Sequence, residues 1–373
     1  MGYRHSFAEI NLKSIEHNAR EFLKHVPEDV SLMAVVKADG YGHGAVPAIK
    51  AAIKAGAKWA GVALVEEGIV LRQAGINDIS ILLLGSWNEN ACAALDQYGI
   101  TPIVYSPESL QSLNAYGKKA GKTMPTHLKI DTGMSRLGLS ETQLDHFITN
   151  FNDYPYLKIE GILSHFSSAD EEDQTFSQLQ MERFQNAINK LKTRCSPEWI
   201  HIANSPGTLQ FPNAVGNLFR LGISLYGHPP CEHLKSTLNL QEALQWKSSI
   251  VQLQWFPANT PISYNRTYTT TQKTRIATVA IGYGDGYSRS LSNKAHVLIR
   301  GEKAPVVGRV CMDMTLIDVT HIRDVKIEDE VVLIGKQGDK QITTTNIADW
   351  MGTITYEVLC NISKRIPRVY KDQ

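Results

Sequence analysis

Cysteine is scarce in this sequence, and the few cysteines are poorly placed for either disulfides or zinc. Five occur among 373 residues; they are odd in number, scattered along the chain and without a CxxC pair. Disulfide frameworks and structural zinc sites need cysteines in recurring, closely spaced sets. We therefore expect a reduced, cytoplasmic protein that has no metal site.

An excess of charge is also missing, as are long apolar runs. The chain carries 38 Lys and Arg against 37 Asp and Glu, a net charge of +1. This balance argues against binding to nucleic acid or to a membrane surface. No stretch reaches the roughly eighteen apolar residues of a transmembrane helix. The N-terminal MGYRHSFAEI lacks the apolar segment of a signal peptide. The length favours two globular domains.

Short apolar runs alternate with helical patterns over residues 30–225. The runs are SLMAVV, KWAGVAL, ISILLLG, TPIVYS, THLKID, LKIEGILSHF, WIHIANS and NLFRLGISLYG. Strands that are apolar almost throughout are typical of a parallel sheet covered on both faces. An open doubly wound sheet would show the same alternation, but eight strands favour a closed (β/α)8 barrel.

The pattern changes after residue 228. The segment HPPCEH interrupts it, and β-branched runs with turn residues follow: RIATVAIGYGDGY, HVLIRG, APVVGRV, MTLIDVT and DEVVLIG. We predict an α/β fold with an N-terminal (β/α)8 barrel over residues 11–228 and a C-terminal mainly-β domain over residues 229–373. Residues 1–10 are expected to add a strand to the second domain.

Polar side chains recur at the carboxyl ends of the predicted barrel strands. Barrel enzymes build their sites at these ends, so the side chains are expected to share one site. They are Lys37, Lys129, Asp131, His165, Asn204, Ser205 and Arg220.

Lys37 lies in AVVKADGYGHG, where three glycines follow the lysine. In a P-loop the glycines precede the lysine, and the spacing GxGxG does not match the dinucleotide pattern GxGxxG. Two interpretations remain: a lysine that reaches solvent past a strand end, or a partly desolvated amine that attacks carbonyl groups. In the second case, the glycines would let Tyr41 and the neighbouring backbone approach a cofactor closely.

Other segments suggest individual functions. The single Asp-Thr-Gly at Asp131 is not an aspartic protease site, because that site needs two such aspartates. Arg136 could bind a carboxylate or a phenolate oxygen, or it could form a surface ion pair. Ser205 before Pro206 is typical of a helix N-cap. A phosphate would dock at this helix start, and phosphate beside a carbonyl-reactive lysine indicates pyridoxal phosphate.

In the second domain, Tyr264 and Cys311 could be catalytic residues or ordinary packing residues. A tyrosine transfers protons when its pKa is lowered, but most tyrosines are packing residues. Cysteine is more often a small core residue than a nucleophile. Neither residue alone indicates a function.

The motifs taken together resemble one family. AVVKADGYGHG is followed in order by KIDTGMSRLG, HFSSADE, ANSPG, RLGISLYG, SYNRTY, GYGDGY, GRVCMDM and TITYE. In this order they resemble the alanine racemases, fold-type III pyridoxal-phosphate enzymes, essentially from end to end. The resemblance implies racemisation of L- and D-alanine by a cytoplasmic homodimer with shared active sites. The reaction would supply D-alanine for peptidoglycan or L-alanine for catabolism.

The resemblance also implies roles for single residues. Lys37 would hold the cofactor and act as one of two bases, with Tyr264 of the partner subunit as the other. The remaining cofactor contacts would be Tyr41, Arg136, His165, Asn204, Ser205, Arg220, Gly222, Ile223 and Tyr356. Substrate binding is implied for Arg136, Cys311, Met312 and Asp313, and a substrate corridor for Asp170, Arg289, Arg309 and Ile354. In some family members the lysine that matches Lys129 is carbamylated.

Three positions depart from the family pattern. Asn265 and Gly284 stand where glycine and alanine, respectively, are frequent in the family, and Thr355 stands where proline is frequent. Asparagine tolerates positive φ, so we expect the loop around Asn265 to keep its conformation.

Three other functions would share part of this pattern. A fold-type III decarboxylase has the same domain plan but places an acidic residue where Arg220 is expected. A periplasmic broad-spectrum racemase would carry an export signal. A barrel-type pyridoxal-phosphate carrier would lack the second domain.

Overall fold

The structure is a computed structural model that describes residues 4–212 and 216–372. The chain forms two compact units. One comprises the chain up to Lys13, Tyr41–Gly44 and the chain from Glu242 onward, and the other comprises Ser14–Gly40 and Ala45–Gln241. The change of unit thus falls between Gln241 and Glu242, and the short segment 41–44 belongs to the β-rich unit.

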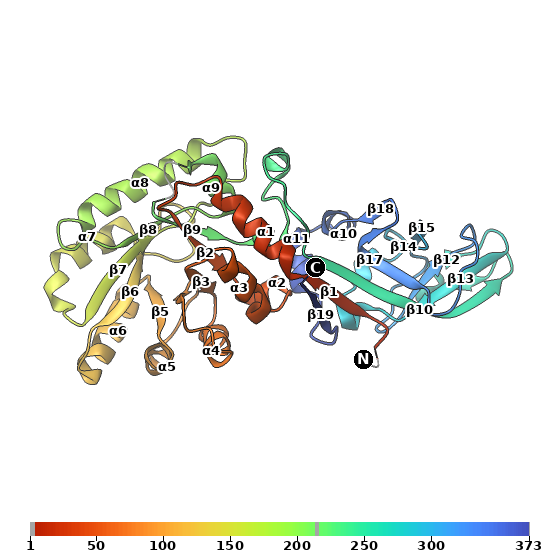
Figure 1. The fold of residues 1–373 in the computed structure, drawn as a ribbon, viewed down its shortest axis with the longest axis horizontal. Helices are drawn as coiled ribbons and strands as arrows, with labels where there is room; N and C mark the ends of the chain where they lie inside the picture. The colour runs from red at the N-terminus through yellow and green to blue at the C-terminus, as the bar shows by residue number, and fades with distance from the viewer. Residues whose placement is uncertain (1–3, 213–215, 373) are drawn as a thin grey trace. The chain divides into compact units, whose positions relative to one another are not determined.

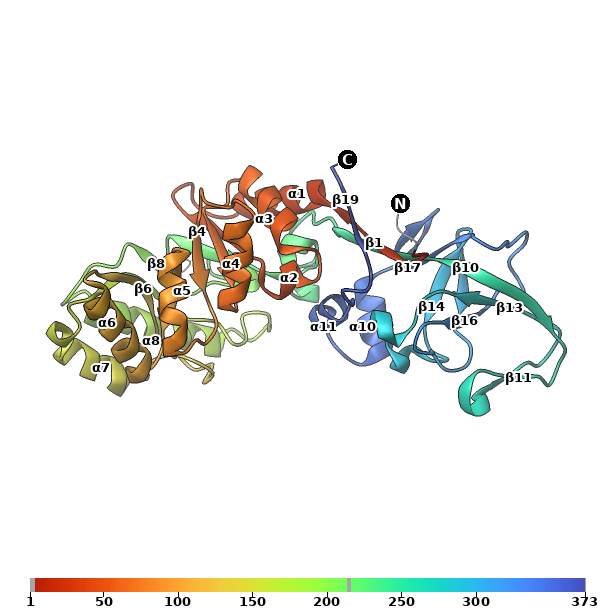
Figure 2. The same cartoon turned by 90° about the horizontal axis from the view of Figure 1, so that it is seen from below.

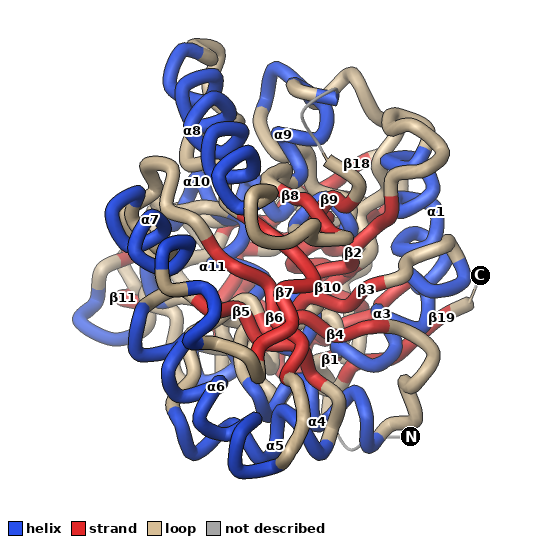
Figure 3. Tube along the Cα trace, turned by 90° about the vertical axis from the view of Figure 1, so that its left-hand side faces the viewer, coloured by secondary structure: helices blue, strands red, loops and turns tan. Residues whose placement is uncertain are grey.

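The barrel unit is built on a parallel sheet in the strand order β8-β7-β6-β5-β4-β3-β2-β9 (Figure 3). The end strands β8 and β9 meet through hydrogen bonds from Asn217 N to Ile200 O and from Arg220 N to Ala203 O, both 3.1 Å. The predicted eight-stranded parallel barrel is thereby confirmed, as a nearly closed barrel. The strands are β2 (Ser31–Val35), β3 (Trp59–Val62), β4 (Ser80–Leu83), β5 (Ile100–Val104), β6 (Met124–Lys129), β7 (Leu157–Leu163), β8 (Trp199–His201) and β9 (Leu218–Leu221).

Helices follow the strands, as the alternating pattern predicts. Helix α6 shows why the sequence folds this way: Ser106 caps its N-terminus, Pro107 occupies its first turn, and Gly121 ends it with φ of 68°. The helices are α1 (Leu12–Leu23), the short turn α2 (Lys37–Tyr41), α3 (Ala45–Lys54), α4 (Val65–Gln73), α5 (Cys92–Gln97), α6 (Pro107–Ala120), α7 (Glu141–Thr149), α8 (Thr175–Leu191) and α9 (Ser205–Gln210).

Apolar side chains fill the barrel interior. One buried cluster takes a residue from each of six strands: Met33, Trp59, Leu82, Ile103, Leu163 and Leu218. Burying a side chain of this size contributes about 1.5–3 kcal/mol. The barrel is therefore a packed support for its carboxyl-end loops rather than a pore.

The β-rich unit holds a nine-stranded sheet whose main path is β15-β14-β17-β10-β1-β19. Strand β1 pairs antiparallel with β10 and parallel with β19, and Figure 1 shows it in red beside the green β10. The strands are β1 (Phe7–Asn11), β10 (Leu244–Phe256), β13 (Thr274–Val279), β14 (His296–Ile299), β15 (Glu302–Pro305), β16 (Thr315–Asp318), β17 (Glu330–Gln337), β18 (Lys340–Ile342) and β19 (Arg368–Lys371). The predicted mainly-β character of this part is confirmed.

Small elements complete the β-rich unit. Strands β11 (Pro261–Ile262) and β12 (Tyr268–Thr269) form a separate hairpin, labelled at β11 in Figure 2. Helices α10 (Thr344–Met351) and α11 (Thr355–Cys360) pack against each other. Throughout both described stretches of the chain, no helix is long and apolar enough to cross a membrane.

Candidate functional site

Lys37 stands at the start of a left-handed turn two residues beyond β2. The backbone φ is 53° at Ala38, 53° at Asp39, 61° at Gly40 and 51° at Tyr41. Left-handed conformation costs an L-residue about 1–2 kcal/mol, and three of these four residues are not glycine. Such backbone persists only where the surroundings hold it. The lysine is therefore placed by a constrained segment and not by a flexible glycine loop.

Several contacts within the barrel unit hold this turn. Gly40 N donates to Val36 O at 2.8 Å, and the Asp39 carboxylate accepts a hydrogen bond of 2.8 Å from Ala45 N. The Glu67 carboxylate accepts from Ala38 N at 2.6 Å.

Gly42 and Gly44 lie where there is no room for a side chain. A Cβ at Gly42 would lie 2.5 Å from Leu359 O, and one at Gly44 would lie 2.1 Å from the Tyr370 hydroxyl oxygen. These glycines therefore allow close packing inside the β-rich unit. The idea that they serve cofactor approach gains no support from this packing.

Arg220, on β9, is buried and almost fully bonded. Its side chain is only 4% exposed. Nη1 donates to Nδ1 of His201 at 2.7 Å and Nη2 donates to Nδ1 of His165 at 2.9 Å. Both nitrogens also donate to backbone carbonyls, of His201, Ser164 and Ile202. Within residues 4–212 and 216–372, Nε has no hydrogen-bond partner. Burial lowers the pKa of Arg220 to about 9, so it stays protonated at neutral pH.

The arginine fixes the tautomers of the histidines around it. Arginine can only donate, so Nδ1 of His165 and of His201 must accept and their protons lie on Nε2. Burial and the charge of Arg220 hold the pKa of both histidines well below the usual range. His201 Nε2 in turn lies 3.0 Å from Nδ1 of His127, which is fully buried. The pKa of His127 falls to about 3, mainly through burial. All three rings are neutral.

Lys129 and Arg136 come together with His165. Together with Asp131, these residues help line a cavity of about 10 Å³ at the ends of β6 and β7. Lys129 is 7% exposed. Burial, followed by the positive charges of Arg220 and Arg136, lowers its pKa to about 8. A substantial fraction of its amine is therefore neutral near pH 8.

The loops after β8 and β9 also meet. Asn204, not Ser205, is the N-cap of α9: its side-chain oxygen accepts from Gly207 N at 3.1 Å. The N-cap prediction for Ser205 was wrong because proline fits either of the first two helical positions, so Pro206 does not identify the cap. Ser205 is instead the first helical residue, and its hydroxyl accepts from Gly222 N at 3.2 Å. Ser205 and Ile223 are both buried.

In the β-rich unit, Tyr41 and Tyr356 lie close together. Their ring centroids are 5.9 Å apart, with the planes tilted by 56°. Tyr356 belongs to α11, whose first residue is Thr355. The structure thus brings together two residues that the family resemblance assigned to cofactor binding.

Tyr264 lies on an exposed loop of the same unit. It is 67% exposed, and Met312 is 53% exposed. Ser263, with φ of 65°, donates its hydroxyl to Arg309 O at 2.8 Å and so ties the Tyr264 loop to the segment before Cys311. Asn265 has φ of 59°, so the expected tolerance of positive φ is confirmed.

The other predicted residues of this loop region and of the corridor occupy defined positions. Asp313 forms an ion pair of 2.7 Å with Arg365, and Cys311 is partly buried with its thiol 3.5 Å from Arg309 O. Ile354, 62% exposed, precedes α11. Asp170 follows β7, and Arg289 begins a short 3-10 helix. The corridor assignment stays a prediction.

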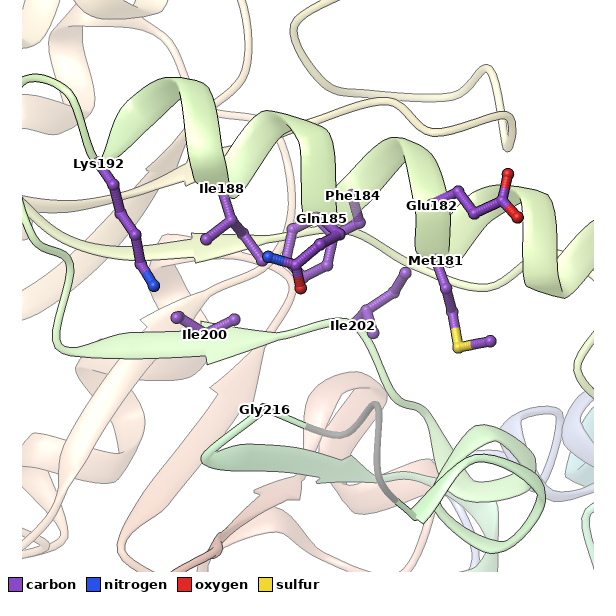
Figure 4. A pocket seen from close by; sticks show the side chains of 9 residues that line it. All are labelled: Met181, Glu182, Phe184, Gln185, Ile188, Lys192, Ile200, Ile202 and Gly216. Carbon is purple, nitrogen blue, oxygen red and sulfur yellow. The ribbon is translucent and has the colours of Figure 1, made fainter.

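A larger groove lies elsewhere on the barrel unit. It measures about 450 Å³ and is formed by α8 side chains facing Ile200 and Ile202 (Figure 4). None of the predicted site residues lines it. It is therefore not part of the candidate site.

Sequence reasoning missed four residues that support the site. His127 and His201 extend the contacts of Arg220, and Glu67 and Gln180 hold loops. Gln180, fully buried on α8, accepts from Ser167 N at 3.0 Å and donates to His165 O at 3.0 Å. His127 stands two residues before Lys129, so strand alternation could have placed both on one face. Nothing in the local pattern singles out Glu67 or Gln180.

Known proteins resemble this chain over its full length. The alanine racemase N-terminal domain model matches residues 10–230 and the C-terminal domain model matches residues 243–370. The alanine racemase of Halothermothrix orenii is 41% identical over 371 residues, covering 99% of this chain and 98% of the relative. The alanine racemase of Symbiobacterium thermophilum is 42% identical over 370 residues, with the same coverage.

Solved structures agree with these sequence matches. Alanine racemase from Bacillus anthracis with bound L-Ala-P gives a TM-score of 0.94 at 35% identity, covering 100% of this chain and 96% of that one. Alanine racemase from Bartonella henselae with covalently bound pyridoxal phosphate gives a TM-score of 0.90 at 30% identity, covering 98% of this chain and 99% of that one. The chain therefore belongs to the alanine racemase family, a family of isomerases.

Proposed function

We propose that this enzyme interconverts L-alanine and D-alanine with pyridoxal phosphate as its cofactor. The observation that carries the proposal is the buried, protonated Arg220, whose Nε donates to no residue in the described part of the chain and which shares a unit with a lysine placed by a constrained turn. This arrangement occurs in a chain matched end to end by the family.

The residues present fit the cofactor. Lys37 supplies an amine, and Arg220 Nε supplies a donor for the pyridine nitrogen. The phosphate would be held by hydroxyls of Tyr41, Ser205 and Tyr356 and by backbone N–H groups of Gly222 and Ile223, and Arg136, His165 and Asn204 would complete the site. Bound pyridoxal phosphate supplies an electron sink for the electron pair left when an α-proton is removed.

The nature of the residue at the pyridine nitrogen bears on the choice of reaction. Arg220 stays protonated at neutral pH with a pKa of about 9, so it offers a hydrogen bond rather than a transferable proton. An acidic residue, as in decarboxylases of this fold type, would instead favour a protonated ring nitrogen and so a stronger electron sink. Arg220 therefore favours racemisation over the decarboxylase alternative.

Inversion at the α-carbon needs one base on each face of the substrate. We assign these bases to Nζ of Lys37 and to the phenolic oxygen of Tyr264 of the partner subunit. The exposure of Tyr264 in a single chain supports its use in another subunit. His165 is neutral and carries its proton on Nε2, so it is suited to donate to the Tyr264 oxygen.

Arg136 is assigned to the substrate carboxylate, together with the segment of Cys311, Met312 and Asp313 of the partner subunit. Lys129 is suited to carbamylation because its pKa of about 8 leaves neutral amine available. In that reaction the amine nitrogen bonds to the carbon of CO2 and one proton is released. The resulting carbamate would carry a negative charge beside Arg136 and orient it.

The assembly follows from this assignment. The barrel, residues 11–228, would bind the cofactor, and the β-rich part, residues 229–373 with residues 1–10, would complete the partner's site in a homodimer. A cytoplasmic enzyme of this kind would supply D-alanine for peptidoglycan or L-alanine for catabolism.

The proposal is tested by incubating purified protein and pyridoxal phosphate with L-alanine in D2O. We expect D-alanine to form by chiral chromatography and the α-hydrogen to be replaced by deuterium in the NMR spectrum. Lys37→Ala should abolish both. Full racemisation by Lys37→Ala, or release of CO2 instead of D-alanine by the unmodified protein, would refute the proposal.

A further inference from the structure

A single carboxylate connects the loop that carries Lys37 to the next loop of the barrel. Glu67 Oε1 accepts from Ala38 N at 2.6 Å, and Oε2 accepts from Ala63 N at 2.8 Å and Leu64 N at 3.2 Å. Ala38 follows β2, whereas Ala63 and Leu64 follow β3. Glu67 thus clamps two successive strand ends with three backbone hydrogen bonds.

The contact with Ala38 acts on the peptide unit of Lys37. The N–H of Ala38 belongs to the peptide bond that joins it to Lys37, so anchoring this N–H fixes the peptide plane next to the lysine Cα. Ala38 is also the first left-handed residue of the turn, with φ of 53° and ψ of 47°. An alanine does not take this conformation unless contacts hold it there.

Glu67 also has a purely structural role, and an experiment must distinguish that role from its contact with Ala38. It is the third residue of α4, whose N-cap, Leu64, has no side-chain cap hydrogen bond. Its bonds to Ala63 N and Leu64 N therefore cap the helix. Loss of the cap would weaken α4 whatever the state of the lysine turn.

We propose that Glu67 is a positioning residue that places the Lys37 amine by holding Ala38 in the left-handed conformation. The proposal rests on the proposed function, in which Lys37 holds pyridoxal phosphate. It adds that the reactivity of the lysine depends on a carboxylate from the first turn of α4, the helix that follows the neighbouring strand β3. It also predicts that glycine at position 38 removes this dependence, because glycine adopts positive φ without steric cost.

The test measures how fast Lys37 bonds to the cofactor. Full-length protein is freed of cofactor by dialysis against hydroxylamine and mixed with pyridoxal phosphate. Aliquots are quenched with borohydride, and the modified lysine is identified and counted by mass spectrometry. We expect Glu67→Ala to slow labelling of Lys37 by about tenfold, the equivalent of one strained residue. The double variant Ala38→Gly/Glu67→Ala should return to within about threefold of the unmodified protein.

Glu66→Ala is the matched control, because Glu66 is an exposed glutamate in the same helical turn. It should label at the unmodified rate. Folding of each variant is checked by thermal unfolding, where Glu67→Ala and the double variant should both lose stability through the lost cap. Should Glu67→Ala not fold, Glu67→Gln takes its place. Its side chain has one acceptor oxygen for three N–H groups, and the same rescue by Ala38→Gly is expected.

Two results would overturn the proposal. One is labelling of Glu67→Ala at the unmodified rate. The other is slow labelling that Ala38→Gly does not restore, which would leave Glu67 with the capping role alone. Failure of the unmodified protein to label at Lys37 would instead refute the proposed function, and so is distinct from both.

Discussion

Replacing Gln180 by methionine tests how the site loops are supported. Gln180 is fully buried and bonds Ser167 N and His165 O, both at 3.0 Å, as well as the Thr132 hydroxyl at 3.2 Å. Methionine has a similar unbranched shape but cannot make these bonds. Thr132 keeps its contact of 2.8 Å with the Ser164 hydroxyl, so two backbone groups lose their partners.

The two backbone groups are not fully buried, because Ser167 is exposed and His165 is half-buried. Losing a hydrogen bond at each should cost about 0.5–1.5 kcal/mol, so the free energy of unfolding should fall by about 1–3 kcal/mol. At about 2–4 °C per kcal/mol for a unit of this size, Tm should fall by roughly 2–12 °C. Because His165 is released as well, kcat of the folded variant should fall by roughly tenfold.

The assay is thermal and urea unfolding followed by circular dichroism, with kcat measured well below Tm. Gln178→Met is the matched control, since Gln178 is an exposed glutamine on the same helix. This control should change stability by less than about 0.5 kcal/mol. A similarly small change in Gln180→Met would refute the reasoning that Gln180 supports the two loops.

Three further predictions concern single residues. Tyr264→Phe should lose racemisation yet still exchange the α-hydrogen of one enantiomer with D2O, because Lys37 still serves its own face; equal exchange of both enantiomers would contradict the two-base assignment. Burial lowers the pKa of Lys129 from its usual 10.5 to about 8, so in CO2-free buffer Lys129→Met should unfold with about 2–3 kcal/mol more free energy than the unmodified protein at pH 7. That advantage should shrink as pH rises from about 8 to 10.5, where the folded lysine has lost its proton and the unfolded one has not; a constant difference across a urea-unfolding pH series would count against it. Thr355→Pro should raise stability by about 0.4–1 kcal/mol, since proline suits the first residue of α11 and Ile354 before it is extended, with ψ of 156°; a loss of Tm would contradict this.

The sequence was sufficient for the barrel and for grouping several of its strand-end side chains. Continuous apolar strands and helical spacing are local signals, and the carboxyl ends of parallel strands share one face, so Lys129, His165 and Arg220 could be grouped before the structure was known. Glycine spacing, by contrast, suggested that the glycines after Lys37 allow the backbone to approach a cofactor closely. The left-handed backbone there extends to alanine and aspartate, because contacts distant in sequence hold it.

The supporting residues escaped sequence reasoning for a related reason. Glu67 and Gln180 are ordinary helix formers in ordinary helical patterns, and only the fold shows which backbone groups they meet. The N-cap at Asn204 was missed because Pro206 permits either neighbour as the cap. These errors concern the support of the candidate site, whereas the choice of reacting groups stays a prediction.

The central claim is that Lys37 of one subunit and Tyr264 of the other form one site. The direct test mixes Lys37→Ala protein with Tyr264→Phe protein, each inactive alone, under conditions where subunits exchange. Each hybrid dimer then holds one intact site and one doubly altered site. Random exchange of equal amounts should restore about a quarter of the unmodified racemase activity. No activity above that of the separate variants, with hybrid dimers confirmed by native mass spectrometry, would contradict the shared site.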